Sequence, residues 1–131
     1  MRIRVYYEDT DCGGIVYHSN YLKYCERARS EAFFKSGIAP LQNGIGFVVK
    51  EMQICFDYPA KLGDLLEVQT QIIGQKSASL QLLQTIYLTN FEIPKKIFSA
   101  TITLVCMDSK TKKITKIPQW AQTIFDTLKG Y

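Results

Sequence analysis

Three side chains capable of acid–base chemistry lie within ten residues near the start of the sequence: Asp9, Asp11 and His18. His18 is the only histidine of the chain, and the adjacent Gly13 and Gly14 separate it from the two carboxylates. Carboxylates can act as general bases or as nucleophiles. Adjacent glycines let the backbone turn sharply and approach a ligand closely. The spacing therefore predicts a loop suited to chemistry on an oxygen that becomes an anion.

A long helix is expected directly after this loop. Apolar or small side chains recur at intervals of three and four and form one stripe, made of Tyr21, Tyr24, Cys25, Ala28 and Ala32. Ser19 or Asn20 is expected to cap the start of the helix, and Gly37 to end it. Free N–H groups and the helix dipole favour negative charge at such a start. The helix would thus present an anion-binding end to the loop.

The rest of the chain reads mainly as strands. Alternating apolar and polar residues predict strands at residues 2–7, 47–58, 65–73, 79–88 and 97–107, and a short helix follows at residues 119–128, with Trp120, Ile124 and Leu128 on one face. One long helix and one antiparallel sheet can bury each other if the sheet curves. We therefore expect an α+β fold with a curved antiparallel sheet wrapped around one central helix. A single layer of this kind commonly needs a partner at its edge.

Composition limits the other possibilities. The 131 residues suit a single domain, residues 1–131, with 47% apolar and 21% charged residues. No apolar run reaches the roughly 20 residues of a spanning helix, and no signal peptide is evident, so a cytoplasmic protein without stable membrane insertion is expected. The four cysteines are scattered and histidine is single, so no metal site is expected.

The net charge of +4 comes from the second half of the chain. Eight basic and eight acidic residues cancel in residues 1–65, whereas eight lysines face four acids in residues 66–131. This excess is either a solvated surface or a landing site for an anionic ligand such as a nucleotide phosphate. Nucleic acid is not expected as a partner, because no aromatic-interleaved basic motif occurs.

Two segments carry a resemblance to a known family. The first combines Tyr7, Asp9, Asp11, Gly14, Ile15, Val16, Tyr17, Asn20 and Tyr21 with Tyr17-His18 and Glu26-Arg27-Ala28-Arg29; the second is Tyr58-Pro59-Ala60-Lys61-Leu62-Gly63-Asp64. Together they resemble hotdog-fold acyl-CoA thioesterases of the 4-hydroxybenzoyl-CoA thioesterase type, most closely the YbgC-like branch. Cys12 is a departure, since other members carry alanine or proline there, and no change of chemistry is expected from it.

The resemblance assigns catalytic roles to three residues. Asp11 aligns with the family's catalytic aspartate, as general base or nucleophile toward a thioester carbonyl; otherwise it is a loop aspartate that bonds its own backbone. The backbone N–H of His18 aligns with the amide that holds the thioester oxygen, and its imidazole could orient water or protonate the leaving thiolate. Tyr7 either donates to Asp11, lines the acyl pocket or packs as the end of a strand. Asp9 is expected to support the loop.

The resemblance also implies how substrate is held. Substrate-binding positions would be Gly14, Tyr17, Asn20, Tyr58, Lys61 and Lys76, the two lysines as candidates for coenzyme A phosphates. The family site lies between two subunits, so a homodimer or homotetramer is expected, with residues 52–58 lining the acyl tunnel. The substrate would be acyl-CoA or an acyl group on carrier protein, with no bound cofactor.

Two other functions fit the same fold. One is a hydratase or dehydratase of 3-hydroxyacyl thioesters, although the spacing and flanks here are not the hydratase pattern. The other is a non-catalytic acyl-binding or scaffold protein, which remains open because some members of the branch associate with envelope and lipid-synthesis machinery. Hydrolysis of an acyl-CoA thioester is the function that two nearby carboxylates fit best.

Overall fold

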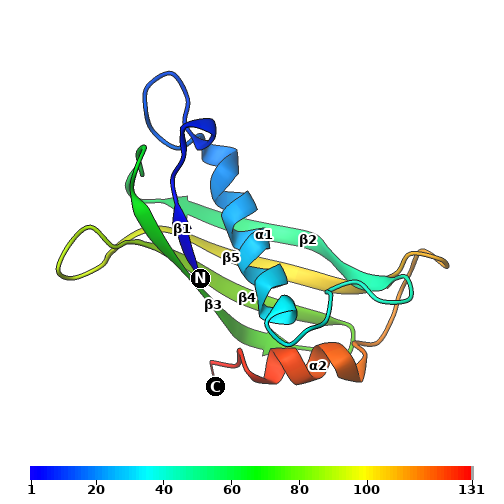
Figure 1. Cartoon of the computed structure of the whole chain (residues 1–131). Helices are drawn as coiled ribbons and strands as arrows, with labels where there is room; N and C mark the ends of the chain where they lie inside the picture. Colours follow the sequence, from blue (N-terminus) through cyan, green and yellow to red (C-terminus); the bar gives the residue numbers. More distant parts are fainter. Residues whose placement is uncertain (131) are drawn as a thin grey trace.

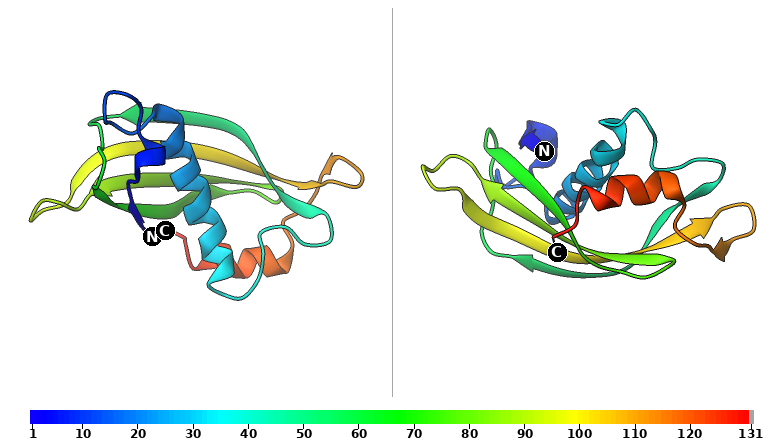
Figure 2. Two further views of the ribbon diagram at one scale, coloured as in Figure 1. Left: turned by 45° about the horizontal axis from the view of Figure 1, so that its top comes forward. Right: turned by 90° about the horizontal axis from the view of Figure 1, so that it is seen from below.

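The computed structural model describes residues 1–130 and contains one antiparallel sheet in the strand order β1-β3-β4-β5-β2, with β6 paired to β5. Its elements are β1 (Arg2–Arg4), the 3-10 helix η1 (Tyr7–Asp9), α1 (His18–Phe34), β2 (Ile45–Phe56), β3 (Leu65–Gln75), β4 (Ser79–Leu88), β5 (Lys95–Asp108), β6 (Lys113–Ile114) and α2 (Gln119–Asp126). Both helices lie on one face of the sheet, which curves around α1 (Figures 1 and 2). The predicted α+β hotdog architecture is confirmed.

Helix α1 begins two or three residues earlier than expected. Its N-cap is Tyr17, whose side chain makes no capping hydrogen bond, so the prediction of Ser19 or Asn20 as the cap is wrong. Asn20 instead donates from Nδ2 to the carbonyl oxygen of Asp9, 2.8 Å away. Gly37 adopts a positive φ of 76° just after the helix, as a helix stop requires. The helix start is therefore tied to the loop that precedes it.

The apolar stripe of α1 packs against the middle of the sheet. Tyr21, Tyr24, Cys25 and Ala28 are buried as predicted, and Phe33 extends the stripe further than expected. The ring of Tyr21 stacks on Phe98 of β5 with centroids 5.2 Å apart. Burying an aromatic side chain removes a large apolar area from water, which holds the helix firmly on the strands.

Strand β2 forms one edge of the sheet and is far more exposed than the alternating pattern suggested. It pairs only with β5, and its other edge has no strand partner within residues 1–130. Met52 is partly buried, whereas Ile54 and Phe56 are 37% and 53% exposed. An edge strand with apolar, unpaired groups is a ready template for another chain.

A bulge divides β2 into two parts. Val49 lies opposite Leu104 and Glu51 lies opposite Thr103, so Lys50 has no partner across the pair. Met52 lies opposite the buried Ile102, and Val49 and Met52 consequently face the same side of the sheet although only two residues, Lys50 and Glu51, lie between them.

The ends of the chain differ in detail from the predictions. Strand β1 ends at Arg4, so the strand predicted for residues 2–7 is too long: its last residue, Tyr7, begins η1. In α2 the fully buried side chains are Ala121, Ile124 and Phe125. The predicted face is correct, because Ile124 is buried and Trp120 and Leu128 are partly buried against the same core, although α2 ends at Asp126.

Within residues 1–130 the structure contains no helix with the length and apolar character that crossing a membrane demands.

Candidate active site

The two sequence segments that carry the family resemblance meet in space beside the start of α1. Ile15 forms a β-bridge with Lys61, and the N–H of Val16 donates to the carbonyl oxygen of Ala60 at 2.8 Å. The hydroxyl of Tyr21 accepts a hydrogen bond from the N–H of Ala60 at 3.0 Å. Residues 58–64 thus form one wall of the loop at residues 9–17.

Asp9 anchors the loop, as expected. Its Oδ2 accepts the N–H of Tyr6 at 2.9 Å, and its carbonyl oxygen accepts from the N–H of Tyr17 at 3.0 Å and from Asn20. The buried Tyr24 hydroxyl has no hydrogen-bond partner within residues 1–130. Burial first, and the charge of Asp9 second, raise the pKa of Tyr24. Asp9 therefore stabilises the loop through hydrogen bonds. It lies in η1, whereas Asp11 follows in the loop.

Asp11 is exposed and only partly engaged. Its Oδ1 accepts the N–H of Gly13 at 2.8 Å, which is the local backbone bond that loop aspartates form. Its Oδ2 has no hydrogen-bond partner in the described part of the chain. The backbone bond orients the carboxylate and leaves one oxygen available to water or to a substrate.

The two glycines have different reasons to be glycine. Gly14 has a φ of 79°, which L side chains rarely adopt, and the space around it is open. Gly13 has no such φ, but a Cβ there would lie 3.2 Å from Oδ1 of Asp11. Gly14 thus permits the turn, while Gly13 leaves room for the carboxylate.

The start of α1 offers free hydrogen-bond donors. The first N–H groups of a helix have no intrahelical acceptor, and the N–H of His18 has no acceptor elsewhere in residues 1–130. The first turn contains no acidic side chain that would compete for a bound anion. The rings of His18 and Tyr17 lie side by side, 4.3 Å apart, and both residues are exposed.

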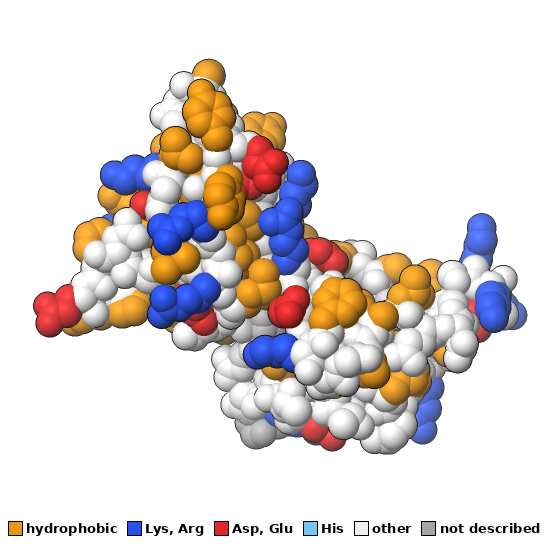
Figure 3. All heavy atoms as spheres, in the orientation of Figure 1, with side chains coloured by type: hydrophobic (Ala, Val, Ile, Leu, Met, Phe, Trp, Pro, Cys, Tyr) orange, Lys and Arg blue, Asp and Glu red, His pale blue; other side chains and the backbone are white. Residues whose placement is uncertain are grey.

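The predicted aromatic site residues are exposed at the surface. Tyr7 is 82% exposed, so the expectation that it packs as a strand end is wrong, and its hydroxyl makes no hydrogen bond to Asp11. Tyr6, Tyr7, Ile15 and Tyr17 are all exposed, and hydrophobic side chains gather at the top of the molecule in Figure 3. Tyr58 lies under the ammonium group of Lys95, 3.5 Å from the ring centre.

The two candidate lysines lie at opposite ends of β3. Lys61 sits beside the loop, where its backbone N–H donates to Oδ2 of the buried Asp64 at 2.9 Å. Lys76 lies in the hairpin after β3, at the far end of an 11-residue strand. Within one chain the structure therefore brings Lys61 to Asp11 but does not bring Lys76 there.

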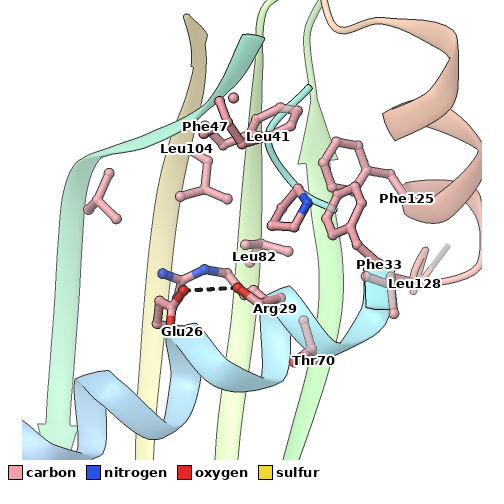
Figure 4. A pocket seen from close by; sticks show the side chains of 14 residues that line it. Glu26, Arg29, Phe33, Leu41, Phe47, Thr70, Leu82, Leu104, Phe125 and Leu128 are labelled. Atoms are coloured by element: carbon pink, nitrogen blue, oxygen red, sulfur yellow. Dashed lines mark hydrogen bonds between the residues drawn. The ribbon is translucent and has the colours of Figure 1, made fainter. Parts of the chain in front are cut away.

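A cavity that the sequence did not reveal lies further along α1. Its volume is about 240 Å³, and its lining includes Glu26, Arg29, Phe33, Phe47, Leu104 and Phe125 (Figure 4). Arg29 donates to the amide oxygen of the fully buried Gln84 at 2.9 Å. The signal in the sequence was Gln84 itself, a polar residue on the apolar face of the strand at residues 79–88.

A family model described as the thioesterase-like superfamily matches residues 5–125. The chain belongs to this superfamily. The YbgC acyl-CoA thioesterase of Helicobacter pylori (strain ATCC 700392 / 26695) is 41% identical to it, over 98% of this chain and 100% of that protein. The YbgC acyl-CoA thioester hydrolase of Escherichia coli O6:H1 is 37% identical, over 89% of this chain and 87% of that protein.

Solved structures agree with this family membership. The probable thioesterase from Bartonella henselae superimposes with a TM-score of 0.77 at 30% identity, covering 90% of this thioesterase and 96% of that chain. These comparisons confirm the resemblance to the YbgC-like branch, and the chain is a thioester hydrolase.

Proposed function

We propose that this thioesterase hydrolyses acyl-CoA to a free acid and coenzyme A, with Asp11 as its reactive carboxylate. The observation that carries the proposal is the exposed Asp11, oriented through Oδ1 and unoccupied at Oδ2, on the loop that leads into a helix start with free N–H groups. The H. pylori and E. coli relatives are named for acyl-CoA thioester hydrolysis.

The reaction uses the loop and the helix start together. Asp11 takes a proton from the water that attacks the thioester carbon, or attacks that carbon itself to form an anhydride that water then cleaves. The N–H of His18 donates to the carbonyl oxygen as negative charge develops on it, with the helix dipole behind. The C–S bond breaks, and the coenzyme A thiolate takes up a proton, for which the imidazole of His18 is a candidate donor.

The remaining site residues hold the substrate or the loop. Gly14 permits the turn that presents Asp11, and Asn20 ties the helix start to Asp9. Tyr7, Tyr17 and Tyr58 offer exposed aromatic surface to the substrate. Lys61 offers its ammonium group to the phosphates of coenzyme A.

A second copy of the chain completes the site in this proposal. The unpaired edge of β2 and its exposed apolar side chains, among them Val49, Ile54 and Phe56, are suited to pairing with an equivalent strand. A homodimer, or a homotetramer built from two dimers, would cover this edge and place the site at a subunit boundary. We expect the enzyme to act in the cytoplasm. Acyl carrier protein is the other substrate carrier to test.

The decisive experiment is the release of free thiol from a panel of acyl-CoAs of increasing chain length, including one aromatic member, by the wild type and by Asp11→Asn. Asparagine keeps the Oδ1 bond to Gly13 but cannot act as a base, so we expect a loss of about 100- to 10,000-fold. Glu8→Gln, at an exposed acid in η1, is the matched control and should retain activity.

Three results would count against the proposal. Retention of activity in Asp11→Asn would remove Asp11 from the chemistry. Silence of the wild type toward every acyl-CoA, followed by cleavage of acyl carrier protein thioesters, would change the substrate carrier. Silence toward both, with binding intact, would favour a binding protein.

A further inference from the structure

The cavity beside α1 is mainly apolar, with polar side chains in its lining from α1 and from Thr70 of β3. Its floor and far wall come from β2, β4, β5 and α2, through Phe47, Leu82, Leu104 and Phe125. Glu26 and Arg29 enter from α1 and reach toward the strands in Figure 4. Two charged side chains in mainly apolar surroundings indicate a site that recognises a polar group.

Arg29 is held in place by a neutral partner that is itself fixed. Its Nη1 donates to Oε1 of Gln84 at 2.9 Å. The amide nitrogen of Gln84 donates to the carbonyl oxygen of Cys25 and to Oγ1 of Thr70, each at 2.9 Å. Gln84 is completely buried, so this chain of hydrogen bonds orients the guanidinium toward the cavity without neutralising it.

The charge of Arg29 has no ion-pair partner within residues 1–130. Burial lowers the pKa of Arg29, and the nearby Cys25 and Glu26 act in the opposite direction. A guanidinium has five N–H donors and remains charged in proteins, and one donor is used by Gln84. A partly buried charge with unused donors favours an occupant that supplies an acceptor.

Glu26 supplies the complementary group one helical turn away. Its Oε1 accepts the hydroxyl of Ser30 at 2.9 Å, and its Oε2 has no hydrogen-bond partner in residues 1–130. Residues three apart on a helix are neighbours on its surface. The cavity wall therefore presents an acceptor and a donor side by side.

A hydroxyl group matches this wall better than the alternatives. It can donate to Glu26 and accept from Arg29 at the same time. A terminal methyl group would leave both polar groups unpaired, which is the costly case for a site built to form hydrogen bonds. A terminal carboxylate would satisfy Arg29 but would meet the like charge of Glu26.

The position of the cavity fits the far end of a substrate. Arg29 lies eleven residues along α1 from His18, or about 16 Å at the helical rise of 1.5 Å per residue. His18, Leu22 and Glu26 recur at intervals of four and so share one side of α1. An acyl group whose thioester lies at the helix start can follow this side to the cavity.

We propose that the cavity receives the distal end of the acyl group and that Arg29 and Glu26 select acyl groups bearing a hydroxyl there. This inference rests on the proposed function, which places the thioester at the start of α1. It makes Arg29 and Glu26 specificity-determining residues and Gln84 the positioning residue of Arg29.

The test compares matched acyl-CoAs from hexanoyl to dodecanoyl, each with a methyl, an ω-hydroxyl or an ω-carboxyl end. In the wild type we expect kcat/KM for an ω-hydroxyl substrate to exceed that of its methyl counterpart by at least about 10-fold. Arg29→Lys, which keeps a charge but loses the fork of donors, should reduce this ratio toward one. Glu26→Gln, at an exposed position that tolerates change, should reduce it by several-fold. Glu31→Gln, on α1 outside this cavity, is the control and should leave the ratio unchanged.

Binding to Asp11→Asn, measured by calorimetry with the same acyl-CoAs, separates this inference from the proposed function. A hydroxyl preference in binding without turnover by the wild type would support the cavity assignment and contradict acyl-CoA hydrolysis. Equal binding of methyl and hydroxyl ends, or a ratio unaffected by Arg29→Lys, would overturn the assignment. A preference for the carboxyl end would equally overturn it, because Glu26 would then not face the ligand.

Discussion

The two ends of α1 are built in different ways. At its start, the loop that carries Asp11 is held mainly by backbone hydrogen bonds, such as those from Tyr17 to Asp9 and from Val16 to Ala60. At its other end, Phe33 packs against Phe47, Trp120 and Phe125 with ring centroids 5.7 to 6.4 Å apart. Backbone bonds orient reactive groups while leaving their side chains exposed, whereas side-chain packing encloses a cavity.

This difference predicts that activity and stability respond to changes at opposite ends of the helix. Asp11→Asn should abolish activity with little effect on folding, because the carboxylate is exposed and its backbone bond is preserved. Changes at the packed end should do the reverse.

Phe33→Ala should lower the free energy of unfolding by about 3–5 kcal/mol, because it removes a buried aromatic ring from the centre of the cluster. Urea denaturation followed by tryptophan fluorescence measures this, since Trp120 lies in the same cluster. Phe34→Ala is the matched control: Phe34 is 54% exposed and its loss should cost much less. Equal losses in the two variants would contradict the described packing.

Stability should fall in the alkaline range because of Cys25. Burial raises the pKa of this completely buried thiol to about 11. A raised pKa in the folded state means that the stabilisation is complete below the unfolded pKa of about 8.5 and is lost as pH rises toward 11. The expected slope is about 1.4 kcal/mol per pH unit over this window.

Unfolding free energies measured from pH 8 to 11 for the wild type and Cys25→Ala should show a shallower slope in the variant. Some slope should remain, because burial also raises the pKa of Tyr24. Cys12→Ala is the control, since this thiol is exposed. An identical slope in wild type and Cys25→Ala would rule out the thiol as its source.

Gly13 and Gly14 should affect different properties, one the activity and the other the stability of the loop. Gly14→Ala should cost about 1–2 kcal/mol of stability, because alanine resists the positive φ of 79° even though the space is open. Gly13→Ala should leave stability nearly unchanged but displace the Asp11 carboxylate, reducing kcat by up to about 100-fold. Thermal unfolding measures the stability of both variants, and thiol release measures their kcat. A stability loss in Gly13→Ala together with a kcat loss in Gly14→Ala would mean that the glycine roles are exchanged.

The smallest effect is expected at the lysines. Lys61→Gln should raise KM for acyl-CoA only a few-fold at low salt, as an exposed charge contributes about 0.2–1 kcal/mol. Lys76→Gln, at the far end of β3, should have less effect if the phosphates lie near Lys61. Steady-state kinetics at two ionic strengths test this ranking. A larger effect at Lys76 would place the phosphates at the other end of the strand.

Local patterns predicted the buried stripe of α1 and its end at Gly37, but not its first residues or the cavity beside it. Asp11, Gly14 and the stripe from Tyr21 to Ala28 are recognisable because their spacing in sequence is their spacing in space. The cavity draws on residues as distant as Arg29, Thr70 and Leu104, which only the folded sheet brings together. Periodicity within one segment contains no information about such contacts.

The local errors have physical causes as well. The segment after Arg4 continues the strand pattern, but Asp9 accepts the N–H of Tyr6 and closes a 3-10 turn instead. Ser19 and Asn20 are good capping residues by type, but Asn20 is engaged with Asp9. In β2, alternation predicted a buried face without indicating that no second strand covers its edge.

The bulge at Lys50 divides β2 into two halves, each of which pairs in register with β5. Because Lys50 alone is unopposed, Val49, which lines the cavity, and Met52 in the other half face the same side of the sheet. Deleting Lys50 would remove the bulge and leave both halves on their present faces, because Val49 already lies opposite Leu104 and Glu51 opposite Thr103 on consecutive residues of β5.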